Sequence, residues 1–238
     1  MLSVDNLVKQ RRSRTILSGV TFRSAPGKVT AFLGPNGAGK TSTLRILLGL
    51  DHPTSGTALI HGRPYRTLRN PLRTVGSMLD GSGAHRSRSA RSHLSWLAHS
   101  NGIPRRRVTE VLEQVGLAAH GRTRVGRLSL GMSRRLDLAA ALLGEPETLV
   151  LDEPVNGLDA GGIRWIRHLL RTHADAGGTV LLSSHLMGEV AEIADDVVVI
   201  NGGQVAAAGP LPHVTEGYAN LEDAFFALTA DPRKDRAR

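Results

Sequence analysis

Apolar residues in the first sixty positions fall into short runs separated by turn residues, a pattern that indicates strands. Leu2 to Val8, Ile16 to Arg23 and Val29 to Leu33 are such runs, and turn residues such as Ala25-Pro26-Gly27 separate them. A fourth run, Thr57 to His61, follows another turn cluster. The chain is therefore predicted to open with β-structure.

The apolar period becomes helical from about residue 90. Helices are predicted at Ala90 to Ser100 and Arg105 to Val115, and each ends beside a glycine, a common helix stop. Beyond them helices and strands alternate, which implies a parallel sheet with helices on both faces. The predicted helices are Leu130–Leu143 and Ile163–Ala174, and the predicted strands are Thr148–Leu151, Thr179–Ser183 and Val197–Ile200.

Composition narrows the class of protein. With 238 residues and 40% hydrophobic content, the chain can bury one good core. The absence of cysteine excludes a disulfide framework and thiolate metal sites, and it fits a reducing cytoplasm. We expect neither a signal peptide nor a membrane span, because Met1 to Leu7 leads directly into a strand and no apolar run approaches about 18 residues.

The positive charge is concentrated in the middle of the chain. Between Arg63 and Arg127 there are 13 arginines against three acidic residues, a local balance of +10, whereas the whole chain carries +9. Three interpretations stay open: a solvated face, attraction to anionic lipid headgroups, or attraction to nucleic acid. Aromatic residues make up only 3%, which argues against stacking platforms for single strands.

A glycine-rich loop lies between the strand Val29 to Leu33 and a short apolar helix, Thr43 to Gly49. It fits G-x-x-x-x-G-K-[ST], in which glycines let backbone N–H groups point into one concavity. The lysine adds charge for the β/γ-phosphates and the following hydroxyl a ligand for Mg²⁺. We therefore predict that the loop binds a nucleoside triphosphate with Mg²⁺. Its residues are Gly34, Pro35, Asn36, Gly37, Ala38, Gly39, Lys40, Thr41 and Ser42.

Two adjacent carboxylates, Asp152 and Glu153, follow the apolar strand that begins at Thr148. Acids at the carboxyl end of a buried parallel strand lie at the edge of the sheet where ligands bind. Beside a phosphate loop, Asp152 can hold Mg²⁺ directly or through water. Glu153 is then free to polarise a water molecule for attack on the γ-phosphorus.

Three further motifs complete an ordered set. Leu128-Ser129-Leu130-Gly131-Met132 stands ahead of the helix that leads to the acidic strand, Asn156-Gly157-Leu158-Asp159 follows that strand, and Ser183-Ser184-His185 ends the next one. In this order the chain resembles, over nearly its whole length, the ATP-binding subunit of an ABC transporter. The three motifs then correspond to the family's signature (usually LSGGQ), its D-loop and its switch-histidine region.

The resemblance implies an α/β fold of the P-loop NTPase (RecA-like) type. A parallel sheet core would carry an N-terminal antiparallel β subdomain and an inserted α-helical subdomain. The implied ABC ATPase domain spans 1–230, with its core at 1–75 and 144–215, the helical subdomain at about 76–143, and a C-terminal helix at about 219–229. We expect residues 231–238, which are charged, to form a disordered tail.

The resemblance also implies roles for residues of the later motifs. Ser129 and Gly131 would grip the γ-phosphate held by a second subunit, so hydrolysis would need a head-to-tail dimer, expected to be a homodimer. Asp159 would couple the two sites and His185 would contact the γ-phosphate. Taken alone, Ser129 and Asp159 are equally well explained as helix N-caps, and His185 as a surface residue.

Three residues depart from the family pattern. Arg11 stands where an aromatic residue usually stacks on adenine, so the base contact would be a guanidinium over a ring face or would be absent. Asp80 replaces the Q-loop glutamine; it could still ligate Mg²⁺ or be an ordinary loop aspartate. Met132 replaces the last residue of the signature. These departures put nucleotide selectivity in doubt.

Leu130 and Met132 of the signature, together with the runs Asp152 to Asp159 and Leu221 to Leu228, resemble one branch of the family in particular. This branch comprises bacterial exporters of drugs, antibiotics and bacitracin whose permease is a separate chain. The chain would then work at the inner face of the plasma membrane, bound to an integral-membrane permease. The alternatives are a soluble ABC-type ATPase acting on nucleic acid or ribosomes, which the single ATPase unit disfavours, and a regulatory subunit with low turnover. A further hypothesis is that Arg86, Arg88, Arg91 and Arg105 to Arg107 face the membrane side and meet the permease or lipid.

Overall fold

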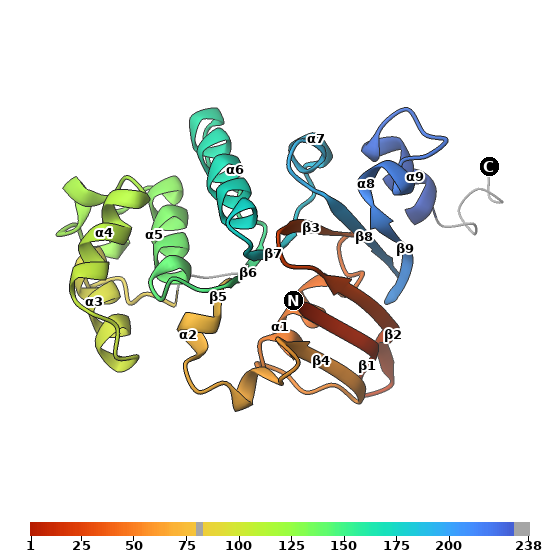
Figure 1. The fold of residues 1–238 in the computed structure, drawn as a ribbon, viewed down its shortest axis with the longest axis horizontal. Coiled ribbons are helices and arrows are strands. Elements are labelled where there is room, and N and C mark those ends of the chain that lie inside the picture. Colours follow the sequence, from red (N-terminus) through yellow and green to blue (C-terminus); the bar gives the residue numbers. More distant parts are fainter. Residues whose placement is uncertain (80–82, 231–238) are drawn as a thin grey trace.

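Two sheets form the framework of the computed structural model, which describes residues 1–79 and 83–230 (Figure 1). The smaller sheet is antiparallel, with strand order β2-β1-β4. Its strands are β1 (Leu2–Arg11), β2 (Arg14–Ser24) and β4 (Ser55–Ile60). The larger sheet has the order β5-β6-β7-β3-β8-β9, with every pair parallel except β8 and β9. Its strands are β3 (Lys28–Leu33), β5 (Val75–Met78), β6 (Thr148–Asp152), β7 (Thr179–Ser183), β8 (Asp196–Asn201) and β9 (Gln204–Pro210).

Helices cover both faces of the larger sheet, as the alternation of strands and helices predicted (Figure 1). Along the sequence, α3, α4 and α5 come between β5 and β6. These three helices pack against one another. The α-helices are α1 (Lys40–Leu47), α2 (Pro71–Thr74), α3 (Ala90–Ser100), α4 (Arg106–Gln114), α5 (Leu130–Leu142), α6 (Ala160–Asp175), α7 (Met187–Ala191), α8 (Leu211–Val214) and α9 (Leu221–Thr229). Short 3₁₀ turns occur at Tyr65–Thr67, Ala118–His120 and Val125–Arg127.

The α/β class and the N-terminal antiparallel sheet are confirmed, but several elements differ from the prediction. Strands β5 and β9 were not predicted: β5 has only four residues, and β9 is rich in alanine and glycine, which are poor strand formers. Helix α6 begins at Ala160 rather than Ile163. Asp159 caps a first turn that contains two glycines, which are poor helix formers and so do not indicate a helix in the sequence. The expected subdomain boundaries stay a prediction, and the expected tail 231–238 lies outside the described residues. Within the described ranges, no helix is both long and apolar enough to span a membrane.

Side chains of β3 alternate between two hydrophobic layers. Val29, Ala31 and Leu33 belong to the hydrophobic cluster that also contains residues of α3, α4, α5 and α6, whereas Phe32 belongs to the cluster formed with α1 and the antiparallel sheet. Phe32 also stacks on Phe22 of β2, with ring centroids 5.0 Å apart. The strand is therefore buried on both faces, as expected for the middle of a parallel sheet.

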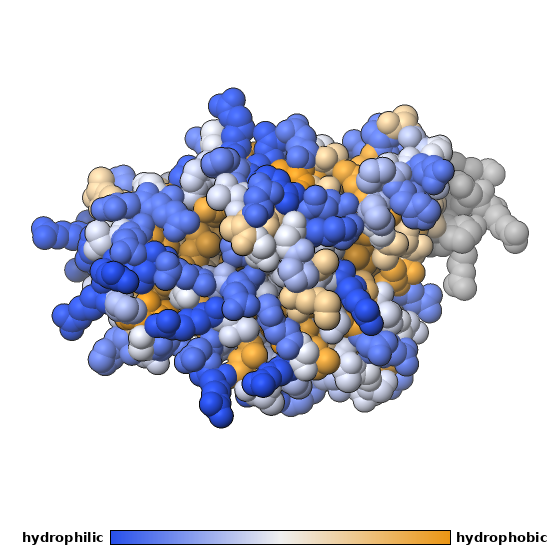
Figure 2. Space-filling model, viewed as in Figure 1, coloured by the Kyte–Doolittle hydropathy of each residue, from blue (hydrophilic) through white to orange (hydrophobic). Residues whose placement is uncertain are grey.

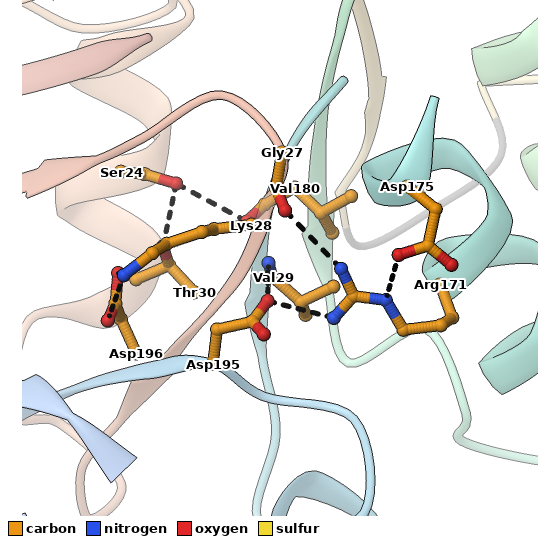
Figure 3. Close-up of polar contacts among 10 residues, drawn as sticks. All are labelled: Ser24, Gly27, Lys28, Val29, Thr30, Arg171, Asp175, Val180, Asp195 and Asp196. Carbon is orange, nitrogen blue, oxygen red and sulfur yellow. Dashed lines mark hydrogen bonds and ion pairs between the residues drawn. The ribbon is translucent and has the colours of Figure 1, made fainter. Parts of the chain in front are cut away.

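Arg171 of α6 ties that helix to the sheet (Figure 3). Its guanidinium donates to Asp195 Oδ2 at 2.8 Å, to Asp175 Oδ1 at 2.9 Å and to the carbonyl of Gly27 at 3.3 Å. Asp195 also accepts the Val29 amide at 2.8 Å. The Asp195 carboxylate, directly before β8, thus joins that strand to α6 and to the start of β3, at the edge of the sheet where both strands begin.

Asp137 is a buried carboxylate on α5, with a side chain only 7% exposed. Its Oδ2 lies 3.9 Å from Arg134 Nη1, and its Oδ1 has no hydrogen-bond partner among the described residues. Burial raises the pKa of Asp137 to about 6, although the Arg134 charge opposes this shift. At neutral pH the helix therefore holds a charge that its surroundings solvate poorly.

Asp137→Asn should stabilise the protein at neutral pH. The folded-state pKa lies above the unfolded value, so the folded state binds more protons between about pH 4 and 6, and stability falls as pH rises through that window. Removing the charge should raise the free energy of unfolding by about 1–3 kcal/mol at pH 7.5 and by less at pH 4.5, measured by urea unfolding. Glu113→Gln, at an exposed position of α4, is the control and should change either value by under about 0.5 kcal/mol. An equal gain for Asp137→Asn at both pH values would contradict the assignment.

Candidate active site

The glycine-rich loop follows β3 directly and folds closely against its neighbours. A Cβ at Gly34 would lie 2.4 Å from the Ile200 carbonyl oxygen, so no other residue fits there. Gly39 has φ +111°, which L side chains rarely adopt. Lys40 Nζ donates to the carbonyl of Gly34 at 2.5 Å. Burial lowers the pKa of Lys40, and the charges of Glu153 and Asp152 oppose that shift.

A cavity of about 370 Å³ opens in front of this loop. It is formed by the start of β2, the loop with the first turn of α1, and the end of β6. Its lining residues are Arg14, Ile16, Asn36, Gly37, Gly39, Lys40, Thr41, Ser42, Asp152 and Glu153. The structure thus brings most of the predicted loop residues together with both predicted carboxylates.

Asp152 lies at the meeting point of three elements. Thr41 Oγ1, at the start of α1, donates to Asp152 Oδ2 at 3.1 Å. Ser183 Oγ donates to Asp152 Oδ1, because the parallel register of β6 and β7 sets these two residues side by side. The carboxylate is buried, and both of its oxygens are held by hydroxyl donors.

Glu153 adopts a backbone conformation that is unusual for a residue with a side chain. Its φ is +52°, and its amide donates to Ser183 Oγ at 3.0 Å and to the Ser183 carbonyl at 3.3 Å. His185 Nδ1 lies 2.8 Å from Glu153 Oε2, with side chains 58% and 20% exposed, respectively. Because such a conformation costs energy, its presence beside the cavity is a recognised mark of functional sites.

Two of the later motifs, those that contain Ser129 and Asp159, do not line this cavity. Ser129 Oγ accepts the Met132 amide at 3.2 Å and caps α5, while Asp159 Oδ1 accepts the Gly162 amide at 2.7 Å and caps α6. The N-cap interpretation of both residues is thereby confirmed. Neither they nor Gly131 line the cavity.

Strand β2 contributes two residues to the lining of the cavity. Arg14 and Ile16 line it, whereas Arg11 does not. Arg11 and Arg14 face each other across the hairpin that joins β1 and β2, so a register argument could have identified Arg14. Ser183 was also missed as a site residue, although it ends a correctly predicted strand. Asp80, the expected Mg²⁺ ligand, lies outside the described residues.

Comparisons with known proteins agree with this arrangement. The family model described as ABC transporter matches residues 17–156. The chain is 36% identical over 225 residues to the lantibiotic transport ATP-binding protein SrtF of Streptococcus pyogenes, which covers 94% of this chain and 96% of that protein. It is 38% identical over 217 residues to the bacitracin transport ATP-binding protein BcrA of Bacillus licheniformis, covering 90% and 71%. A solved structure of the ATP binding subunit of an ABC transporter matches with a TM-score of 0.88 and 25% identity, covering 97% of this chain and 100% of that one.

Arg14→Ala should weaken nucleotide binding more than Arg11→Ala does. Both changes remove one positive charge from the same hairpin, but only Arg14 lines the cavity. We expect a loss of about two- to fivefold in ATP affinity for Arg14→Ala, the size of one exposed cation–π or charge contact, measured by titration calorimetry. Arg11→Ala serves as the matched control and should stay within about twofold of the unaltered protein. A larger loss for Arg11→Ala would return the base contact to Arg11.

Proposed function

Because this chain belongs to the ABC transporter family and is therefore an ATPase of that family, we propose that it powers a membrane exporter of antibiotics or similar small amphipathic compounds. The observation that supports the catalytic part is the 2.8 Å contact between His185 Nδ1 and Glu153 Oε2. It lies beside the cavity that the phosphate loop lines. The cargo rests on the relatives, which are named for lantibiotic and bacitracin transport.

In the proposed reaction, the loop amides and Lys40 hold the β- and γ-phosphates of ATP. Glu153 accepts a proton from the water that attacks the γ-phosphorus, the bond to the β,γ-bridging oxygen breaks, and ADP leaves with inorganic phosphate as the second product. His185 orients the Glu153 carboxylate and approaches the γ-phosphate. The low exposure of the Glu153 side chain favours a fixed orientation of this base.

Mg²⁺ fits the donor set beside the loop. Thr41 Oγ1 and Asp152 Oδ2 lie 3.1 Å apart, and hydroxyl and carboxylate oxygens are the ligands that this ion prefers. We propose that these two residues hold Mg²⁺ together with the phosphates, and that Asp80 contributes to the same ion. When bound, the ion neutralises charge on the phosphates.

The active unit that we propose is a head-to-tail homodimer. Ser129, Gly131 and Asp159 lie outside the cavity of their own chain, as expected for residues that complete the site of a second copy. The dimer would bind an integral-membrane permease encoded as a separate chain, at the inner face of the plasma membrane. Action on nucleic acid or ribosomes is not favoured, because the relatives reported above are transport ATP-binding proteins.

Glu153→Gln should separate binding from hydrolysis. The amide preserves size but cannot accept the proton, so we expect phosphate release to fall by at least about 100-fold while ATP affinity stays within about threefold. Glu222→Gln, at an exposed position of α9, is the isosteric control and should leave both unchanged. Lys40→Ala should instead lose ATP binding. Turnover by Glu153→Gln at the unaltered rate would remove Glu153 as the base.

Resistance of a bacterium to these antibiotics should depend on ATP hydrolysis by this chain. Co-expressed with its proposed permease partner, the chain should raise the concentration of bacitracin or a lantibiotic that a sensitive bacterium survives. The Glu153→Gln variant, present at equal abundance, should give no protection because export needs turnover. Protection by the variant, or none by the unaltered pair against either class of compound, would contradict the exporter assignment.

A further inference from the structure

Two segments far apart in the sequence run side by side next to α3. The Gly126 amide donates to the Arg86 carbonyl at 2.9 Å, and the Val125 amide donates to the Arg88 carbonyl at 2.9 Å. The Arg91 amide donates to the Gly121 carbonyl at 2.8 Å, in line with these bonds. The backbone thus joins the stretch 86–91 to the stretch 121–127.

Six arginines gather on these two joined stretches, a set that we call the arginine seam. They are Arg86, Arg88, Arg91, Arg122, Arg124 and Arg127. All are exposed except Arg91, which is half-buried and donates to Thr109 Oγ1. Among the described residues, none of the six forms an ion pair with a carboxylate within 4.0 Å. Because these charges have the same sign and no carboxylate beside them, they repel one another, and a bound anion would reduce that repulsion.

The sequence hypothesis grouped three of these arginines with Arg105 to Arg107. The structure gives Arg107 other partners, because it bonds Glu110 at 2.7 Å and the Leu142 carbonyl at 3.3 Å. Arg105 and Arg106 are exposed and form no ion pair among the described residues, but the backbone bonds above join the stretch 121–127, and not 105–107, to the stretch 86–91. Figure 2 shows hydrophilic side chains projecting around the end of the molecule formed by α3 and α4.

An exposed aromatic residue adjoins the seam. Trp96 of α3 is 52% exposed, and the Arg88 guanidinium lies 5.0 Å from its ring centroid. Stacking on the ring leaves the N–H edge of Arg88 free to donate to a phosphate. An amphipathic indole beside cationic side chains is the combination found where proteins meet the headgroup layer of a membrane.

We propose that the arginine seam, with Trp96, binds the anionic phospholipid headgroups of a membrane surface. Guanidinium groups match phosphates bidentately, and several arginines near a negatively charged leaflet act together. A membrane fits these observations better than an acidic protein does, because the surface is a spread of like charges with an indole at its side. The proposal takes only the nearness of a membrane from the proposed function, and it requires neither ATP nor the permease.

Sedimentation of the full chain with vesicles tests this, with phosphatidylglycerol and phosphatidylcholine in one set and phosphatidylcholine alone in the other. The seam variant changes Arg88, Arg122, Arg124 and Arg127 to Gln. The control variant changes Arg23, Arg63, Arg69 and Arg164 to Gln, four exposed arginines elsewhere, so both variants lose the same net charge. Steady-state ATPase activity without vesicles is measured in parallel for all three proteins.

We expect the unaltered chain to bind the anionic vesicles and not the neutral ones, with binding that weakens as salt rises. The seam variant should lose at least about 100-fold in affinity, at roughly fivefold per arginine, and the control variant less than tenfold. Fluorescence of Trp96 should shift to the blue on binding, read in a Trp165→Phe background. Unchanged ATPase activity in the seam variant would separate this result from the proposed function.

Equal losses in the two variants would overturn the proposal, since general charge would then explain the attraction. Binding only when the permease is present in the vesicle would overturn it in favour of an acidic protein partner. If the seam variant does not fold, judged by its circular dichroism, the pair Arg122→Gln and Arg124→Gln replaces it, against Arg63→Gln and Arg69→Gln. The paired comparison then decides the proposal by the same criterion.

Discussion

The parallel register of three strands is the constraint on which the site depends. Hydrogen bonding between β6 and β7 sets Asp152 beside Ser183, and bonding between β3 and β7 sets Phe32 beside Ser183 as well. The three carboxyl ends are therefore level, and the chain leaves each of them toward the same edge of the sheet. The phosphate loop, the carboxylates and His185 meet there, although the loop lies more than a hundred residues before the other two in the sequence.

The central strands and long helices were predictable because burial imposes its period on them. Strand β3 and helix α5 have strong apolar patterns, and both were found at nearly their observed bounds. Strand β9 was not predicted because Ala207 and Ala208 owe their extended conformation to pairing with β8 rather than to their own preference. Tertiary hydrogen bonding, which no local pattern records, decided that element.

The same distinction applies to the site. Lys40, Thr41, Asp152 and Glu153 belong to contiguous motifs, so their place in one cavity followed from the sequence alone. Arg14 owes its place to the hairpin of β1 and β2, whose two-residue turn sets it across from Arg11. The arginine seam likewise arises from backbone hydrogen bonds between stretches about 35 residues apart. The count of charged residues along the chain indicated that this part of the molecule is positive, but not which arginines lie together.

The positive φ of Glu153 sets stability against activity at a single position. A left-handed conformation costs a residue with a Cβ on the order of 1 kcal/mol, whereas glycine adopts it freely. Glycine here would relax the backbone and remove the carboxylate in the same step. Directed evolution for heat resistance alone would therefore drift toward inactive proteins at this codon, and glutamate is retained only where selection acts on function.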